Sequence, residues 1–276
     1  MTIVGLLNPG AMGASIGAAA LTNVEDVLWT SEGRSDATRI RAEKAGLTNA
    51  GSFTDLVDAS ELILSVCPPA SALELANEVF SLGFKGTYVD CNAIAPEQTR
   101  AIAEIASNKG ARLVDGGIIG GPAWQAAAGT KLWLSGPDIS EVTALFEHSP
   151  LHTGVAGSEI GAASALKMCF AAFTKGSTAL LAAVLAVADK EGVGDALAEQ
   201  WGEAFTNKTK QQVTTNSSKA WRFAGEMEQI AATFDSAGLP GGFHEAAADV
   251  FYRLSEFKDW QSKPAFDDLL QALQSK

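Results

Sequence analysis

The sequence predicts an N-terminal α/β domain with a mostly parallel sheet, followed by an all-helical domain. Over the first 156 residues, short and almost wholly apolar segments alternate with helical segments, which is typical of a parallel sheet covered on both faces. Residues 157–276 show helical patterns throughout. A stretch rich in helix-forming residues, 157–191, joins the two patterns without a proline. We therefore expect domains at residues 1–156 and 157–276, with one long helix between them.

The first domain begins with a strand, a tight turn and a helix. Residues 2–7 are apolar and predict the strand, and residues 11–21 are mostly small and predict the helix. Further strands are predicted at 27–30, 61–67, 87–91, 112–115 and 131–135. Because ligands of such sheets bind at the carboxyl ends of the strands, we expect a cofactor across the loops that follow them.

The second domain reads as a series of helices after the long one. They are predicted at 195–205, 208–215, 219–237, 243–254 and 264–274. Two lysines, Lys167 and Lys175, lie eight residues apart inside the apolar part of the long stretch, on roughly one face of a helix.

Composition argues against several classes of partner. The net charge of −12 disfavours non-specific binding to nucleic acid. The apolar run between Lys175 and Asp189 is too short to span a bilayer, so we expect no membrane association. The three cysteines form no disulfide or CxxC pattern, so we expect a cytoplasmic protein without a metal site.

A glycine-containing turn follows the first strand and suggests dinucleotide binding. Asn8 stands at the first position of a G-x-G-x-x-G pattern, and Gly10 and Gly13 occupy the second and third. Glycines there would let a pyrophosphate approach the backbone. Glycine and proline are also common in ordinary strand–helix turns, so the pattern alone leaves both interpretations open.

Four motifs, taken in order, resemble the β-hydroxyacid dehydrogenases, a superfamily that includes 3-hydroxyisobutyrate dehydrogenase, 6-phosphogluconate dehydrogenase and, more distantly, the imine reductases. Residues 8–13 (NPGAMG) resemble its G-x-G-x-M-G turn, and residues 89–96 resemble its D-x-S-T-x-x-P strand end. Residues 115–121 resemble its D-A-P-V-S-G-G substrate loop, and residues 157–167 its G-x-G-x-x-x-K helix start. Beyond residue 190 the chain is similar to a loosely characterised helical domain. The resemblance implies a Rossmann-type first domain, a nicotinamide cofactor, a small-molecule substrate and a homodimer.

The resemblance assigns Lys167 as the general acid/base of a hydride-transfer reaction that interconverts an alcohol and a carbonyl. Desolvation and a nearby positive nicotinamide both lower the pKa of a lysine, which suits this role. The alternative is that Lys167 extends from an apolar helix to solvent. For Lys175 we expect a substrate contact or an interdomain ion pair.

Two departures from the family pattern concern the substrate. Ala171 stands where the family has an asparagine, and Ile119 stands where its substrate loop has a serine. We therefore expect a bulkier, less acidic hydroxy compound than the usual small hydroxyacid. An imine or enamine reductase and an inactive nicotinamide-binding sensor remain alternatives. The expected substrate-site residues are Ile119, Gly120, Gly121, Trp124, Ala171, Lys175, Trp221 and His244.

The loop after the second strand should set the choice between NADP and NAD. NAD enzymes place an acid on the ribose about 20 residues after the glycines, whereas NADP enzymes place an arginine near the 2′-phosphate. Both Glu32 and Arg34 lie in range, and hydroxyls at Thr30, Ser31 and Ser35 could join Arg34 on a phosphate, which favours NADP. The full set of expected cofactor residues is Asn8, Pro9, Gly10, Ala11, Met12, Gly13, Thr30, Ser31, Glu32, Arg34, Cys67, Pro68, Pro69, Asn92 and Ala93.

Overall fold

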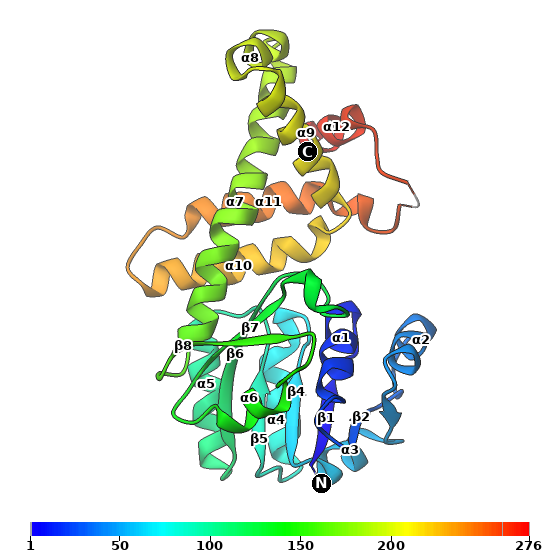
Figure 1. The fold of residues 1–276 in the computed structure, drawn as a ribbon. Coiled ribbons are helices and arrows are strands. Elements are labelled where there is room, and N and C mark those ends of the chain that lie inside the picture. The colour runs from blue at the N-terminus through cyan, green and yellow to red at the C-terminus, as the bar shows by residue number, and fades with distance from the viewer. Residues whose placement is uncertain (1, 261, 276) are drawn as a thin grey trace. The chain divides into compact units, whose positions relative to one another are not determined.

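The computed structural model describes residues 2–260 and 262–275 (Figure 1). The chain divides into two compact units, one ending at Lys167 and the other beginning at Met168. The first unit contains a sheet covered by helices, and the second is wholly helical. The predicted fold class is therefore confirmed.

The first unit is built on an eight-stranded sheet with the order β3-β2-β1-β4-β5-β6-β7-β8. Its strands are β1 (Ile3–Leu7), β2 (Asp26–Trp29), β3 (Thr48–Asn49), β4 (Leu62–Ser65), β5 (Thr87–Asp90), β6 (Arg112–Ile119), β7 (Lys131–Ser135) and β8 (His152–Gly157). Neighbouring strands are parallel except at the β6–β7 pair. The carboxyl ends of β1, β2, β4, β5 and β6 consequently lie along the same edge.

Helices cover both faces of this sheet. The helices of the unit are α1 (Ala11–Ala20), α2 (Asp36–Lys44), α3 (Phe53–Ala59), α4 (Ala72–Ser81), α5 (Pro96–Asn108) and α6 (Ser140–Leu145). One core, around Leu6 and Val89, packs α1, α2 and α6 on the sheet. The other core, around Leu7 and Tyr88, packs α3, α4 and α5 on the opposite face. Burial of both faces explains why the strands are almost wholly apolar.

A row of polar residues interrupts the second of these faces. Ser65, Asp90, Asp115 and Ser135 are partners in register across β4, β5, β6 and β7, and each is fully buried. Buried polar side chains are costly unless they are hydrogen-bonded. The partners of this row organise much of the candidate site.

The second unit consists mainly of helices that follow the long helix α7 (Ala162–Lys190), which begins in the first unit. They are α8 (Gly194–Trp201), α9 (Glu203–Ser217), α10 (Ala220–Ser236), α11 (Gly242–Arg253) and α12 (Phe266–Gln274). Helix α7 begins later than predicted because Gly157 ends β8 and Gly161, with φ of +99°, precedes the first turn. The predicted break between 205 and 208 was wrong: the chain breaks at Gly202, where φ is +80°, and α9 continues without interruption.

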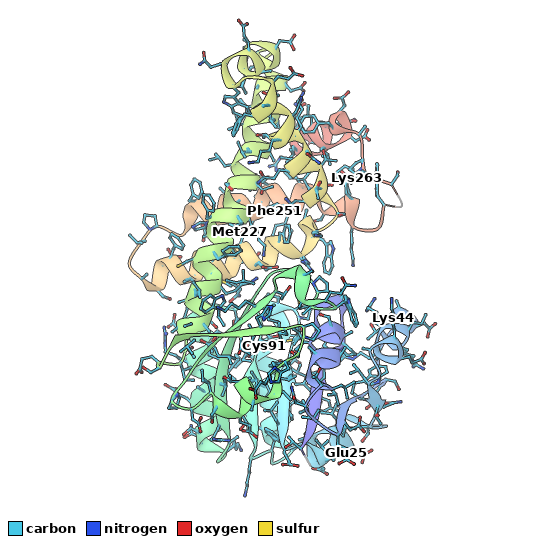
Figure 2. All side chains as sticks on the ribbon, viewed as in Figure 1. Glu25, Lys44, Cys91, Met227, Phe251 and Lys263 are labelled. Atoms are coloured by element: carbon cyan, nitrogen blue, oxygen red, sulfur yellow. The ribbon has the colours of Figure 1, made fainter. Side chains whose placement is uncertain are left out.

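Helices α10 and α11 pack side by side in this unit. The rings of Phe223 and Phe251 meet edge to face with centroids 5.4 Å apart. Figure 2 places Met227 on α10, where this helix meets α7, and a Cβ added to Gly176 of α7 would lie 3.8 Å from the Met227 methyl carbon. A methyl group at position 176 would therefore make an ordinary van der Waals contact with α10.

Helix α7 is long and apolar enough to cross a membrane on length and composition alone. Its most apolar 18-residue window has a mean hydropathy of 1.6, and 39% of that window is buried within the protein. Core helices of soluble proteins pass the same test, so one such helix is weak evidence for a membrane span.

Candidate active site

The turn after β1 forms a backbone cradle at the start of α1. Asn8 has a φ of +69°, and its carbonyl oxygen accepts a hydrogen bond from the Gly10 amide at 2.7 Å. A Cβ on Gly13 would lie 2.5 Å from the same carbonyl oxygen, so only glycine fits there. The tight turn brings the amide groups at the N-terminus of α1 to the carboxyl edge of the sheet, an arrangement that suits a pyrophosphate.

The loop after β2 brings Arg34 to this turn. Arg34 Nη1 donates to Asn8 Oδ1 at 2.9 Å, and Arg34 Nε is buried with no hydrogen-bond partner among the described residues. Arg41 on α2 has a similarly unpartnered, buried Nε within the described chain, and its Nη2 donates to Thr38 Oγ1 at 3.0 Å. Ser35 caps α2 and its hydroxyl lies 3.2 Å from that of Thr38. Two guanidinium groups and two hydroxyls thus gather at the start of α2, and they fit a phosphate group.

Other residues expected in this loop are used locally or point to solvent. The Thr30 hydroxyl, which is buried, donates to Gly51 O and accepts from Glu32 N. Ser31 Oγ accepts from Asn49 Nδ2, and the Glu32 side chain is exposed. Thr38 and Arg41 were not predicted from the sequence. Their spacing from the helix cap at Ser35 is the signal that could have identified them.

A cavity of about 410 Å³ lies beside the turn. Four of its lining residues were expected at a cofactor site, namely Asn8, Arg34, Cys67 and Pro68. The other four, Ser71, Glu74, Leu75 and Glu78, belong to α4 and the turn before it, and the sequence analysis missed them. Pro69, which was expected to bind cofactor, begins this short 3₁₀ turn.

Asn92 is turned inward at the end of β5. Its Oδ1 accepts from the Cys67 amide at 2.6 Å, and its Nδ2 donates to Ser65 Oγ at 3.0 Å and to Asp90 Oδ2 at 3.1 Å. The Asn92 amide donates to Asp90 Oδ1 at 3.0 Å. Burial raises the pKa of Asp90 to about 7, against the opposing effect of these hydrogen bonds from Asn92. Ala93, expected beside Asn92 at the cofactor, is half-buried.

The thiols near this edge are poor nucleophiles. Burial, followed by the nearby charge of Asp90, raises the pKa of Cys67 to about 12. The same two causes raise the pKa of Cys91, which Figure 2 labels within the first unit. Both thiols therefore stay protonated at neutral pH.

Asp115 holds the N-terminus of α7 against the sheet. Its Oδ2 accepts from the amides of Gly161, Ala163 and Ser164 at 2.9, 3.0 and 3.1 Å. It also accepts the Ser135 hydroxyl at 2.8 Å, and Asp115 Oδ1 accepts the Ser164 hydroxyl at 2.6 Å. A buried carboxylate at a helix N-terminus satisfies otherwise orphaned amides and interacts favourably with the helix dipole.

This anchor places Lys167 beside β6. A Cβ on Gly117 would lie 2.5 Å from the Ala163 carbonyl oxygen and 3.2 Å from the Lys167 Cβ. The missing side chain at Gly117 thus lets α7 approach the strand closely. Because side chains alternate along a strand, Ile119 lies on the same face as Asp115 and Gly117. Lys167, which is half-buried, is therefore next to the start of the expected substrate loop.

The expected substrate loop continues from β6 and is tied to α1. Gly120 has a φ of +133°, Gly121 O accepts from Thr130 Oγ1 at 2.6 Å, and neither glycine is fully buried. The Ala123 amide donates to Ser15 Oγ at 2.9 Å. Trp124 is 43% exposed, so a large aromatic surface is open to solvent in this loop.

The remaining expected substrate residues lie in the second unit. Ala171 is buried, and Lys175 forms an ion pair with Glu226 of α10 within the same unit. The Lys175 Nζ also lies 4.7 Å from the centroid of the Phe223 ring. Trp221 is 43% exposed, with Lys258 Nζ 4.3 Å from its ring centroid.

His244 is buried among aromatic rings in this unit. Its ring lies 4.3 Å from that of Phe234 and 5.5 Å from that of Phe243, centroid to centroid. Its Nδ1 has no hydrogen-bond partner in the described part of the chain, and burial lowers its pKa. The described residues also contain no group of three or more His, Cys, Asp or Glu side chains that could hold a metal.

Comparison with known proteins explains the first unit. The model of the NAD binding domain of 6-phosphogluconate dehydrogenase matches residues 2–150, more than half of the chain. The chain belongs to this family. A model described only as a domain of unknown function matches residues 188–254. An uncharacterized 28.5 kDa protein from Methanothermus fervidus is 32% identical over 186 residues, which are 66% of this chain and 71% of that protein.

Solved structures agree with this assignment. A conserved protein described as structurally similar to 3-hydroxyacid dehydrogenases is 26% identical, with a TM-score of 0.68 over 93% of this chain and 98% of that one. A 3-hydroxyisobutyrate dehydrogenase from Mycobacterium tuberculosis shares the fold at 16% identity, with a TM-score of 0.70 and full coverage of both chains. An imine reductase from Streptomyces aurantiacus has a TM-score of 0.57 at 17% identity, covering 99% of this chain and 100% of that one. The protein is a nicotinamide-dependent oxidoreductase of the β-hydroxyacid dehydrogenase superfamily.

Proposed function

We propose that this protein interconverts an alcohol and a carbonyl, with Lys167 as general acid/base and NADP as the preferred cofactor. The observation that carries the proposal is the placement of Lys167 beside Gly117, on the face of β6 that leads to Ile119. A bound nicotinamide supplies the hydride in reduction and accepts it in oxidation. Lys167 then donates a proton from Nζ to the developing alkoxide, or accepts the hydroxyl proton in the reverse direction.

The chain's own residues suit the cofactor in two places. Gly13 permits the tight turn against the Asn8 carbonyl, and the open space at Gly10 suits a pyrophosphate at the start of α1. The unpartnered Nε atoms of Arg34 and Arg41 within the described chain support recognition of a 2′-phosphate.

The replacement Arg34→Ala tests the choice of cofactor. It should raise the KM for NADPH by roughly 10- to 100-fold, as expected for a charged hydrogen bond, and change that for NADH far less. Arg39→Ala is the matched control, because Arg39 is an exposed arginine on α2, the helix that follows Arg34. An unchanged ratio of the two KM values in Arg34→Ala would contradict the NADP assignment.

The apolar residues Ile119 and Ala171 support a bulkier, less acidic hydroxy substrate than a small hydroxyacid. Neither side chain can hydrogen-bond a substrate carboxylate or hydroxyl. A site that hydrogen-bonds a carboxylate or hydroxyl of its substrate rejects analogues that lack this group. An apolar site discriminates mainly by the size of the substrate.

A substrate panel with Lys167→Met tests the reaction. Alcohols, carbonyls and imines are screened by the absorbance of the reduced nicotinamide. The variant should lose about 10²- to 10⁴-fold in kcat for the alcohol–carbonyl pair and retain cofactor binding. Lys190→Met at the far end of α7 is the control. Turnover of imines with no loss in Lys167→Met would identify an imine reductase, whereas tight cofactor binding without turnover of any compound would identify a sensor.

We also propose a homodimer that covers the exposed face of α7. Phe170, Phe173, Leu180 and Val187 are 46%, 77%, 50% and 61% exposed. Their spacings of three and seven residues place them along one stripe, as at a helix–helix interface. Phe173→Glu should convert the dimer to a monomer in light scattering, and a wild type that is monomeric at micromolar concentration would refute this.

A membrane location for α7 is less well supported than the dimer. The Lys175–Glu226 ion pair lies in the middle of the helix, where charges in lipid are costly. We therefore propose a cytoplasmic protein. Recovery of the full chain only in detergent-solubilised membranes would contradict this.

A further inference from the structure

Asn92 joins two loops at the carboxyl edge of the sheet. We propose that it is a positioning residue for the cofactor: its carboxamide ties the loop after β5 to the loop after β4 and so holds Cys67 and Pro68 in place as a wall of the cofactor cavity. The inference rests on the proposed function, because it takes this cavity as part of the cofactor site.

The carboxamide of Asn92 is fully engaged and has one possible orientation. Its oxygen accepts from the Cys67 amide, and its nitrogen donates to Ser65 Oγ and Asp90 Oδ2. If the amide were flipped, its NH₂ group would face the Cys67 amide and its oxygen would face the Asp90 carboxylate. The Cys67 amide can only donate, so it fixes the orientation of the Asn92 carboxamide, and the ionised Asp90 carboxylate favours the same orientation.

Cys67 connects the hydrogen bonds of Asn92 to the cavity. Cys67 and Pro68 line the cavity together with Asn8 and Arg34. Cys67 lies two residues after the end of β4, and its amide is bonded to the Asn92 side chain instead of to a neighbouring strand. Because Asn92 is only 3% exposed, it affects the cavity through Cys67 and does not itself line it.

The alternative is that Asn92 only stabilises the fold, as buried hydrogen-bonded residues often do. A swap of the pair separates the two roles. Asn92→Asp keeps an acceptor for Cys67 but sets two carboxylates against each other. The double variant Asp90→Asn/Asn92→Asp returns a donor opposite an acceptor, since the new carboxamide at position 90 would donate to the new carboxylate at position 92, and the Ser65 hydroxyl can rotate to donate.

The experiment measures the Kd of NADPH and NADH by fluorescence titration, together with thermal unfolding, for the full-length protein. Asn92→Asp should raise the Kd of the better-bound cofactor by about tenfold or more, and the double variant should return it to within about threefold of wild type. Asn108→Asp, an exposed residue on α5, is the matched control for the added charge and should leave the Kd unchanged.

Each outcome bears on one proposal. If wild-type protein binds neither nucleotide, the proposed function fails and not merely the role of Asn92. If it binds and Asn92→Asp binds equally well, or the double variant recovers thermal stability without recovering the Kd, the positioning role is wrong. If Asn92→Asp does not fold, Ser65→Ala decides: it removes one contact to the carboxamide, and a Kd equal to that of wild type would overturn the proposal.

Discussion

Removal of the Asp115 carboxylate should destabilise the protein more than any other single polar change in the first unit. Asp115→Ala would take the acceptor from the amides of Gly161 and Ser164, while Ala163 would keep its bond to Ser135 Oγ at 3.0 Å. Each orphaned buried amide costs about 1–3 kcal/mol. The lost interaction with the dipole of α7 adds roughly 1–2 kcal/mol. The free energy of unfolding should therefore fall by about 3–8 kcal/mol, a large part of the roughly 5–15 kcal/mol typical of a domain.

The isosteric change Asp115→Asn separates charge from shape. Its carbonyl oxygen can still accept from the amides of α7, and the Ser164 hydroxyl can rotate to accept from its NH₂ group. We expect a loss of about 2 kcal/mol, mainly from the helix dipole and the weaker neutral hydrogen bonds. Both variants should also lower turnover, because Lys167 lies one turn beyond Ser164 on the same helix.

Urea denaturation followed by circular dichroism measures these losses as shifts of the midpoint at constant slope. Asp138→Ala is the control, because Asp138 is an exposed carboxylate that accepts from the amide and hydroxyl of Ser140, the first residue of α6. It should cost less than either Asp115 variant. If Asp115→Ala lost less than about 1 kcal/mol, the assignment of Asp115 as the anchor of α7 would be wrong.

Two further predictions follow from the same sheet. Gly117→Ala should move α7 away from β6, since the new methyl would lie 2.5 Å from the Ala163 carbonyl oxygen. The kcat should therefore fall while the Kd of NADPH changes little. An unchanged kcat would contradict the placement of Lys167. The pH dependence of stability should contain a contribution from Asp90, whose pKa of about 7 in the folded protein lies above its ordinary value of 3.8. Between these two pH values the folded state holds a proton on Asp90 that the unfolded state has released. The free energy of unfolding contributed by Asp90 therefore falls as pH rises from about 4 to 7. The total loss is about 4 kcal/mol, at about 1.36 kcal/mol per pKa unit. The titratable neighbours of this carboxyl are Asp115, Cys67, Tyr88 and Cys91. In urea titrations, Asp90→Asn should gain stability relative to wild type between about pH 4 and 8, and parallel curves would refute the prediction.

The sequence predicted the features that depend on local pattern. The strand at 131–135 was predicted with both ends correct, because its apolar residues are bounded by clear turn signals. The glycine turn was recognised because its backbone geometry is set by the residues themselves. For β6 the predicted start at Arg112 was correct and the carboxyl end was wrong. The prediction stopped at Asp115, since Gly116 and Gly117 have low strand propensity, yet the strand runs to Ile119.

The missed features depend on contacts between distant segments. Gly117 is explained only by the close approach of α7, which no local window contains. Glu74 and Glu78 line the cavity because α4 packs beside the turn after β1, although they read as ordinary helix surface. The inward orientation of Asn92 depends on Ser65, 27 residues earlier, and so could not be read from the strand-end motif that contains it.

The spacing along β6 has a consequence for attempts to change the substrate. Asp115, Gly117 and Ile119 lie on one face of β6. The strand therefore fixes the spacing between the residue that anchors α7, the residue that α7 approaches closely and the residue at the start of the substrate loop. A single insertion or deletion between Asp115 and Ile119 would turn Ile119 to the opposite face while leaving the anchor where it is. Beyond Ala123, whose amide is bonded to Ser15, the exposed residues that begin with Trp124 carry no such constraint from the strand. Loop-length variation in directed evolution should therefore be tolerated after Ala123 and eliminated within the strand.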